Sequence, residues 1–390
     1  HGLPVLSYKT GWRAYPGASI GWRLSEEAFM RNVDVISDAK IRAEYGLLGR
    51  CPTRGMDYPF YPTRQDGVPT PELKPETVKA ANLGLDLGLL EQRFTLTADG
   101  FVRNSQNMVS EVPIPSHAGP GGVDPGSNYR YQNIGSAKDV GLELVVDYTH
   151  DPRNDPDIFN FDMGGNVTLL RNQVVSLVND TLFGNNTITY EGASMSMFYG
   201  FVADGVFRSR DEVDAYTTVD ETGDVVKIQP NASAGDVKYK DLNNDGTIDD
   251  LDRTIIGNPW PLFTFGAKLG AAFKGLDLST FWTGSVGNDI YAASRMSVVD
   301  PHLTGSSYAN REKGVMGAYN WKNDGKTPRI DDEDPNGNSR PSTRFVQDGS
   351  YVRLKTMRLS YRLPARILRG FNAAGGTMSM YFQIDNLLTM

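Results

Sequence analysis

Oxygen-bearing side chains are concentrated in residues 241–252, where their spacing matches that of a calcium-binding loop. Gly246 supplies the sharp turn in the middle of this stretch. The predicted ligands, at positions 1, 3, 5, 7, 9 and 12 of the loop, are Asp241, Asn243, Asp245, Thr247 through its backbone carbonyl, Asp249 and Asp252. A calcium ion takes about six to eight oxygen ligands, so the sequence predicts a structural Ca2+ in this loop.

Two features of the loop leave a second interpretation open. Position 12 is Asp252, where an EF-hand usually has a bidentate Glu, and no amphipathic helix flanks the stretch. The alternative is a solvated Asp/Asn turn that holds no metal.

A long amphipathic hairpin follows directly. From Phe263 to Phe273, apolar residues alternate with polar or small ones such as Thr264 and Lys268. A period of two places the apolar residues on one face of a β-strand. A turn at Lys274 leads into a second strand-like segment, residues 277–284. The oxygen-rich loop therefore caps a long hairpin.

The composition narrows the class of protein. The 390 residues are 39% hydrophobic, yet no apolar run approaches the roughly 20 residues that a membrane helix requires. This excludes a helical membrane protein and leaves room for a β-barrel, whose alternating strands average out as hydrophilic. The net charge of −8 and the lack of a dense basic cluster give no support for nucleic-acid binding.

The residues that most often carry catalysis are sparse. Cys51 is the one cysteine, and the four histidines are scattered. A carbohydrate-cleaving enzyme would need two carboxylates facing each other across a cleft. The acidic run at Asp331, Asp332, Glu333 and Asp334 is more typical of a solvated loop, so the sequence predicts that the chain is not an enzyme.

The clearest hairpin spans residues 82–99. Every odd position from Leu83 to Leu89 is leucine, and the alternation resumes at Phe94 after a tight turn. It continues for about ten residues, the length that crosses a bilayer at a tilt, whereas strands of soluble sandwiches usually have five or six.

Connections along the chain alternate between short and long. Long ones are predicted at residues 49–75, 104–129, 179–258 and 287–348. Outer-membrane barrels have short periplasmic turns and long extracellular loops. The sequence therefore predicts an all-β, transmembrane antiparallel β-barrel with about ten strands in this chain, in which residues 179–258 form a long extracellular insertion containing the calcium-type loop.

Several segments resemble motifs of one family, the SusC/RagA-type TonB-dependent outer-membrane transporters. Those that carry the resemblance, in chain order, are residues 15–27, 73–86, 133–143, 198–207, 235–246, 256–259, 287–291, 338–344 and 348–355. Asp139 departs from the family pattern, which commonly has Asn at that position.

The resemblance implies a barrel of roughly 22 strands with a plugged lumen, of which residues 1–390 are the C-terminal portion. The plug domain, the TonB box and the final strand are expected to be absent from this chain. Both ends look cut, because the chain opens on His1 and stops inside a predicted strand, residues 378–385.

The resemblance also implies a function. Such a protein would actively import a glycan or a peptide across the outer membrane, together with a SusD-like surface lipoprotein that acts as a lid and with TonB. Its wall would contact outer-membrane lipid. A passive porin and a secreted β-rich binding protein remain alternatives, and the sequence does not distinguish a glycan from a peptide substrate.

Overall fold

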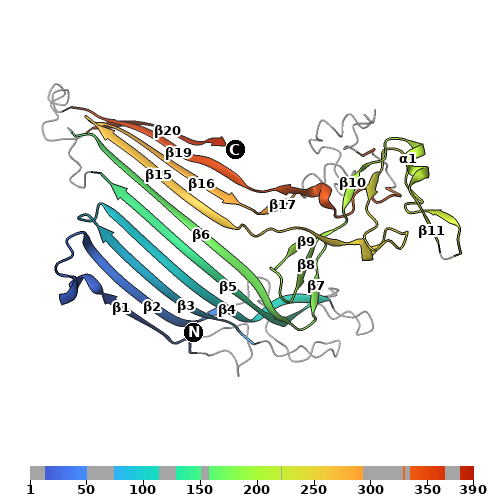
Figure 1. Ribbon diagram of the computed structural model, residues 1–390, viewed down its shortest axis with the longest axis horizontal. Coiled ribbons are helices and arrows are strands. Elements are labelled where there is room, and N and C mark those ends of the chain that lie inside the picture. The colour runs from blue at the N-terminus through green and yellow to red at the C-terminus, as the bar shows by residue number, and fades with distance from the viewer. Residues whose placement is uncertain are drawn as a thin grey trace, which may run out of the picture.

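A computed structural model of the chain describes residues 14–50, 74–113, 129–150, 158–220, 222–292, 328–329, 334–364 and 378–390. Its main feature is a ten-stranded antiparallel sheet, here called the wall (Figure 1). The strands of the wall are β1 Gly17–Arg23, β2 Ile36–Arg50, β3 Glu76–Leu89, β4 Phe94–Pro113, β5 Tyr129–Thr149, β6 Asn160–Leu177, β15 Phe263–Phe273, β16 Leu276–Val286, β19 Tyr351–Arg362 and β20 Ser379–Thr389.

The strands of the wall neighbour one another in chain order, which confirms the predicted antiparallel meander of about ten strands. Short connections join them at one end of the sheet, such as the turn between β15 and β16 at Lys274 and Gly275. Two 3-10 turns, Leu24–Glu26 and Ala28–Met30, lie between β1 and β2. Among the described residues, no helix is long and apolar enough to cross a membrane.

The register of the wall separates its two faces. One row of paired residues runs Trp22, Ile41, Leu85, Ala98, Leu144, Val167 and Phe265 from β1 to β15. The neighbouring row on the opposite face runs Arg42, Gly84, Asp99, Glu143, Thr168 and Thr264. We call these the apolar face and the polar face.

The apolar face of the wall is open. Ile20 is 73% exposed, Leu83 is 61% exposed and Leu269 is 53% exposed. Leucines and isoleucines exposed in adjoining rows form a surface that a water-soluble domain would bury. This exposure agrees with the expectation that the wall contacts lipid.

Several wall strands are longer than the sequence predicts, and β4 is the clearest case. Residues 104–129 were expected to form a loop, but β4 continues to Pro113 and β5 begins at Tyr129, where the two are paired. The added part of β4 starts with Asn104, Ser105 and Gln106, which lack the alternation of apolar and polar residues. Their place in the sheet comes from backbone pairing with β5, which no side-chain period reports.

Between β6 and β15 the chain forms a folded insertion. Its elements are β7 Thr181–Phe183, β8 Thr187–Tyr190, β9 Met197–Gly200, β10 Ala203–Val206, α1 Arg210–Ala215, β11 Thr217–Val219, β12 Val225–Lys227, β13 Val237–Tyr239, the 3-10 turn Asp250–Asp252 and β14 Thr254–Gly257. It lies beyond one end of the wall (Figure 1). A second long connection, between β16 and β19, adds β17 Asp289–Tyr291, the 3-10 turn Thr343–Phe345 and β18 Val346–Asp348.

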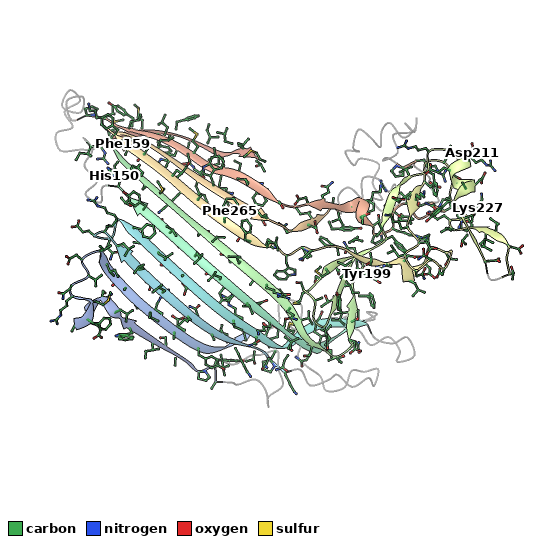
Figure 2. The ribbon with its side chains drawn as sticks, in the orientation of Figure 1. His150, Phe159, Tyr199, Asp211, Lys227 and Phe265 are labelled. Atoms are coloured by element: carbon green, nitrogen blue, oxygen red, sulfur yellow. The ribbon has the colours of Figure 1, made fainter. Side chains whose placement is uncertain are left out.

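The buried core lies mainly outside the wall. Phe207, Val237, Tyr239 and Phe345 have no exposed surface, and all four belong to the two long connections. Figure 2 places Asp211 and Lys227 at the far end of the insertion, whereas His150 and Phe159 lie at the other end of the wall.

Candidate functional site: the external body and the polar face

The acidic loop at residues 241–252 folds as a series of tight turns. The Asp241 carboxylate accepts hydrogen bonds from the backbone N–H of Asn244 at 2.6 Å and of Gly246 at 2.8 Å. The Asp245 carboxylate accepts from the Thr247 backbone N–H at 2.9 Å and from the Asn243 side chain at 2.7 Å. Gly246 has φ of +85°, which its lack of a Cβ permits.

The second half of the loop is organised by Asp252, which is fully buried. Its carboxylate accepts from the backbone N–H of Leu242 at 2.7 Å and of Asp249 at 2.9 Å. The Asp249 side chain accepts from the Leu251 backbone N–H at 2.7 Å, so Asp249 and Asp252 form a capping box. Asp252 thus joins the two ends of the loop.

The predicted ligands have the right chemistry for a hard cation, but hydrogen bonds within the loop engage them. Among the described residues, no three His, Cys, Asp or Glu side chains are grouped so that they could hold a metal ion. Hydrogen bonds from the Thr247 backbone and the Asn243 side chain keep the pKa of Asp245 below its usual range. This carboxylate is therefore anionic at neutral pH, which a cation site requires, while Ca2+ itself remains a prediction from the spacing.

The two long connections are joined into one unit, which we call the external body. The Phe201 N–H donates to the Pro341 carbonyl at 2.8 Å, and the Thr343 N–H donates to the Phe201 carbonyl at 3.0 Å. The Phe201 ring lies 5.6 Å from that of Tyr239, and the Arg340 guanidinium lies 5.4 Å from the Phe201 ring. Residues more than 130 positions apart in the chain thereby share one core.

A buried amide network holds this core together. The Asn338 side chain accepts from the Val237 N–H at 2.8 Å, and the Gln229 side chain donates to the side-chain Oδ1 of Asn336 at 2.8 Å. The Gln229 side-chain Oε1 accepts from the Tyr239 N–H at 2.8 Å. The Asn338 and Gln229 side chains satisfy backbone groups of the short strand β13, as buried polar groups require.

An ion pair completes the junction. The Asp236 carboxylate, which is fully buried, accepts from Arg329 Nε at 2.7 Å and from Arg329 Nη2 at 3.1 Å. It also accepts from the Asn338 side-chain amide at 2.9 Å. A two-point guanidinium–carboxylate contact fixes the relative position of the two segments more strictly than a single contact does.

On the polar face of the wall, a guanidinium reaches across a glycine. Arg42 on β2 contacts Asp86 on β3 at 2.8 Å and Asp99 on β4 at 3.1 Å. The residue between Arg42 and Asp99 in the register is Gly84. A Cβ at Gly84 would lie 2.6 Å from Asp99 Oδ1 and 2.7 Å from Arg42 Cζ. The absence of a Cβ at Gly84 therefore leaves the space in which the Arg42 and Asp99 side chains meet.

The same arrangement recurs on the polar face several strands away, between β5 and β15. Lys268 on β15 contacts Asp147 on β5 at 2.8 Å, and Gly164 on β6 lies between them in the register. A Cβ at Gly164 would collide with both side chains. Gly84 and Gly164 thus leave space on the polar face for ion pairs between strands that are not neighbours. The sequence alone does not predict these pairs.

The remaining candidate residues divide between described and undescribed parts of the chain. Cys51, Asp331, Asp332 and Glu333 lie outside the described residues. Asp334 accepts from the backbone N–H of Asn338 at 2.6 Å and of Ser339 at 3.1 Å, a turn-stabilising role. His150 stacks on Phe161 with a centroid distance of 4.9 Å.

A family model described as TonB dependent receptor-like, beta-barrel matches residues 5–387. The chain belongs to this family. Its wall is accordingly part of an outer-membrane β-barrel, as predicted. Membership in a family of receptors also supports the prediction that the chain is not an enzyme.

Two curated relatives illustrate the match. The chain is 29% identical to TonB-dependent receptor P26 of Formosa agariphila over 93% of its own length and 37% of that protein. It is 26% identical to TonB-dependent receptor SusC of Bacteroides thetaiotaomicron over 74% of its own length and 29% of that protein. The chain therefore spans well under half the length of these receptors.

The fold matches solved receptor barrels. The chain superposes on a structure of the RagAB peptide transporter with a TM-score of 0.71, covering 99% of this chain and 40% of the other at 20% identity. A structure of the RagAB peptide importer in an open-open state gives a TM-score of 0.70. At this identity the likeness concerns the fold.

Proposed function

We propose that this receptor barrel takes part in active nutrient import across the outer membrane. In this proposal a SusD-like surface lipoprotein closes over the external body and TonB powers the opening of a plugged lumen. The family match over residues 5–387 carries the proposal. A plug, a TonB-interacting segment and the remaining strands would come from parts of the receptor other than this chain.

The faces of the wall support the proposal physically. A surface of exposed leucine, isoleucine and phenylalanine side chains suits hydrocarbon, and the polar face offers ion pairs and hydroxyls to a lumen. The external body supplies a rigid platform at the extracellular end, where a lid would dock.

The test is uptake by cells that carry or lack the receptor gene. Deletion should abolish growth on the transported nutrient at low concentration, and a strain without TonB should show the same loss. A passive porin, the second candidate, would keep its uptake without TonB. TonB-independent uptake would therefore overturn the proposal in favour of the porin.

The substrate class remains a glycan or a peptide. RagAB, whose fold this chain shares, is a peptide transporter. The test is binding of labelled oligosaccharides and oligopeptides to the purified receptor with its lipoprotein. If the receptor binds neither oligosaccharides nor oligopeptides, the result would count against import of either class.

We also infer that the loop at residues 241–252 takes up Ca2+ as a structural ion. The spacing of Asp241, Asn243, Asp245, Thr247, Asp249 and Asp252 supports this, although their present hydrogen bonds would have to be exchanged for the ion. Calcium would then stiffen an exposed turn next to the lid-facing surface. Titration of the purified receptor with Ca2+ by calorimetry tests the inference, with Asp245→Ala as the variant expected to lose binding.

A further inference from the structure

The outermost part of the external body is a short two-stranded hairpin, β11 and β12. Val219 on β11 pairs directly with Val225 on β12, and they are 63% and 70% exposed. The other face of the hairpin is occupied, because the Thr218 side chain packs on Gly246 of the acidic loop. Val219 and Val225 therefore present an apolar pair outward from the body.

Hydrogen bonds to one carboxylate close the turn of the hairpin. The Asp220 carboxylate accepts from the backbone N–H of Thr222 and of Asp224, both at 2.9 Å, and from the Thr222 hydroxyl at 2.7 Å. Lys227 forms an ion pair with Asp214 of α1. A preformed hairpin loses little conformational entropy when it binds a partner.

The surroundings of the apolar pair are acidic. Residues 179–258 contain 15 Asp and Glu against 6 Lys and Arg, a net charge of −9, whereas the whole chain carries −8. The rest of the chain is therefore close to neutral, and the negative charge is concentrated in the insertion. Asp220 and Asp224 directly flank Val219 and Val225, and Asp211 lies on the neighbouring helix α1 (Figure 2).

We infer that Val219 and Val225 form a docking point for a protein partner whose contact surface has an apolar centre and a basic rim. An apolar centre ringed by charge is the usual arrangement of a protein interface, and the acidic rim selects a partner of opposite charge. The inference rests on the proposed function, since the surface lipoprotein lid is the partner to which it commits.

The experiment uses the intact receptor in detergent and the purified SusD-like surface lipoprotein that the proposed function assigns to it. The double variant Val219→Thr/Val225→Thr keeps the side-chain shape and the β propensity, but it replaces one methyl group of each valine with a hydroxyl and so weakens the apolar contact. Its binding should be about tenfold weaker than wild type. Val178→Thr, at a valine that is 59% exposed beyond the end of β6, is the matched control and should bind as wild type does.

A second variant tests the charge without touching the hairpin. Asp211→Asn should leave binding at high salt unchanged and weaken it at low salt, because it removes part of the electrostatic attraction. Equal binding by wild type and both variants would overturn the inference while leaving the import proposal intact. If the wild-type receptor binds no such lipoprotein, the inference and the partner in the proposed function fail together. Loss of binding in the Val178→Thr control as well would overturn the assignment to this hairpin.

Discussion

The wall and the external body are stabilised in different ways. In the wall, each strand pairs with its neighbour in the chain or with the one across an insertion, and its side chains sort by alternation onto two faces. In the external body, short strands are held by buried amides and one ion pair between segments about 100 residues apart. The comparison shows that one receptor can combine a wall specified by local pattern with loops specified by distant polar contacts.

The largest effect is expected from removing the ion pair of the external body. Asp236→Ala leaves the Arg329 guanidinium and the Asn338 amide without this acceptor, which should destabilise the body by about 3–5 kcal/mol. Hydrogen exchange should rise at β10 and β13 while the wall stays protected. The control is Asp214→Ala, which breaks an exposed pair with Lys227 and should change stability by about 0–1 kcal/mol. Equal exchange in the two variants would show that the buried Asp236–Arg329 pair does not hold the external body together.

The next effect sharpens the assignment of the two faces. Leu144→Arg puts a charge on the apolar face and should destabilise the folded barrel by about 2–4 kcal/mol, since the cation would lie in hydrocarbon. Glu143→Arg, at the adjacent position on the polar face, should have a much smaller effect. Unfolding in lipid vesicles with denaturant measures both. A larger loss for Glu143→Arg would mean that the faces are assigned the wrong way round.

A smaller effect is expected from filling the space over Gly84. Gly84→Ala places a methyl group against Arg42 and Asp99 and should destabilise the wall by about 1.5 kcal/mol, through loss of a charge-assisted hydrogen bond. Gly100→Ala is the control, because a Cβ there meets no atom within 4 Å. The same denaturant unfolding compares them, and an equal change in both would remove the role given to Gly84.

The smallest effect concerns calcium. At about 1 mM Ca2+ and a dissociation constant of about 0.1–1 mM, typical of extracellular sites, binding would stabilise the loop by about 0.4–1.4 kcal/mol. Chelation should therefore raise exchange only at residues 241–252 and weaken lid binding without unfolding the wall. Asp245→Ala should make the loop insensitive to chelation. An unchanged loop on chelation of the wild type would leave the solvated-turn interpretation.

Prediction from sequence follows the same division between wall and body. The alternation at residues 83–89 predicts the second half of β3, and that at Phe263–Phe273 predicts the whole of β15, because side-chain period reports directly on a two-faced strand. The extension of β4 beyond Arg103 is not predicted, since polar side chains occupy both of its faces at residues 104–107.

The junction inside the external body was not predicted at all. The contact of Asn338 with Val237 spans 101 positions, and no local period encodes it. One signal was present, because residues 235–246 and 338–344 both belong to the segments that resemble the family. Polar motifs without an evident chemical role are candidates for mutual hydrogen bonding, and pairing these two would have brought the loops together.

The bridge between Phe201 and Ser342 has a practical consequence for engineering. If the segment between β6 and β15 were replaced with that of another receptor, its core residues would lose the partners that they have in the segment between β16 and β19. Chimeras that exchange either segment alone should misfold at the cell surface, and those that exchange both should not. Any selectivity that depends on these two segments would accordingly be transferred between receptors only when both are exchanged together.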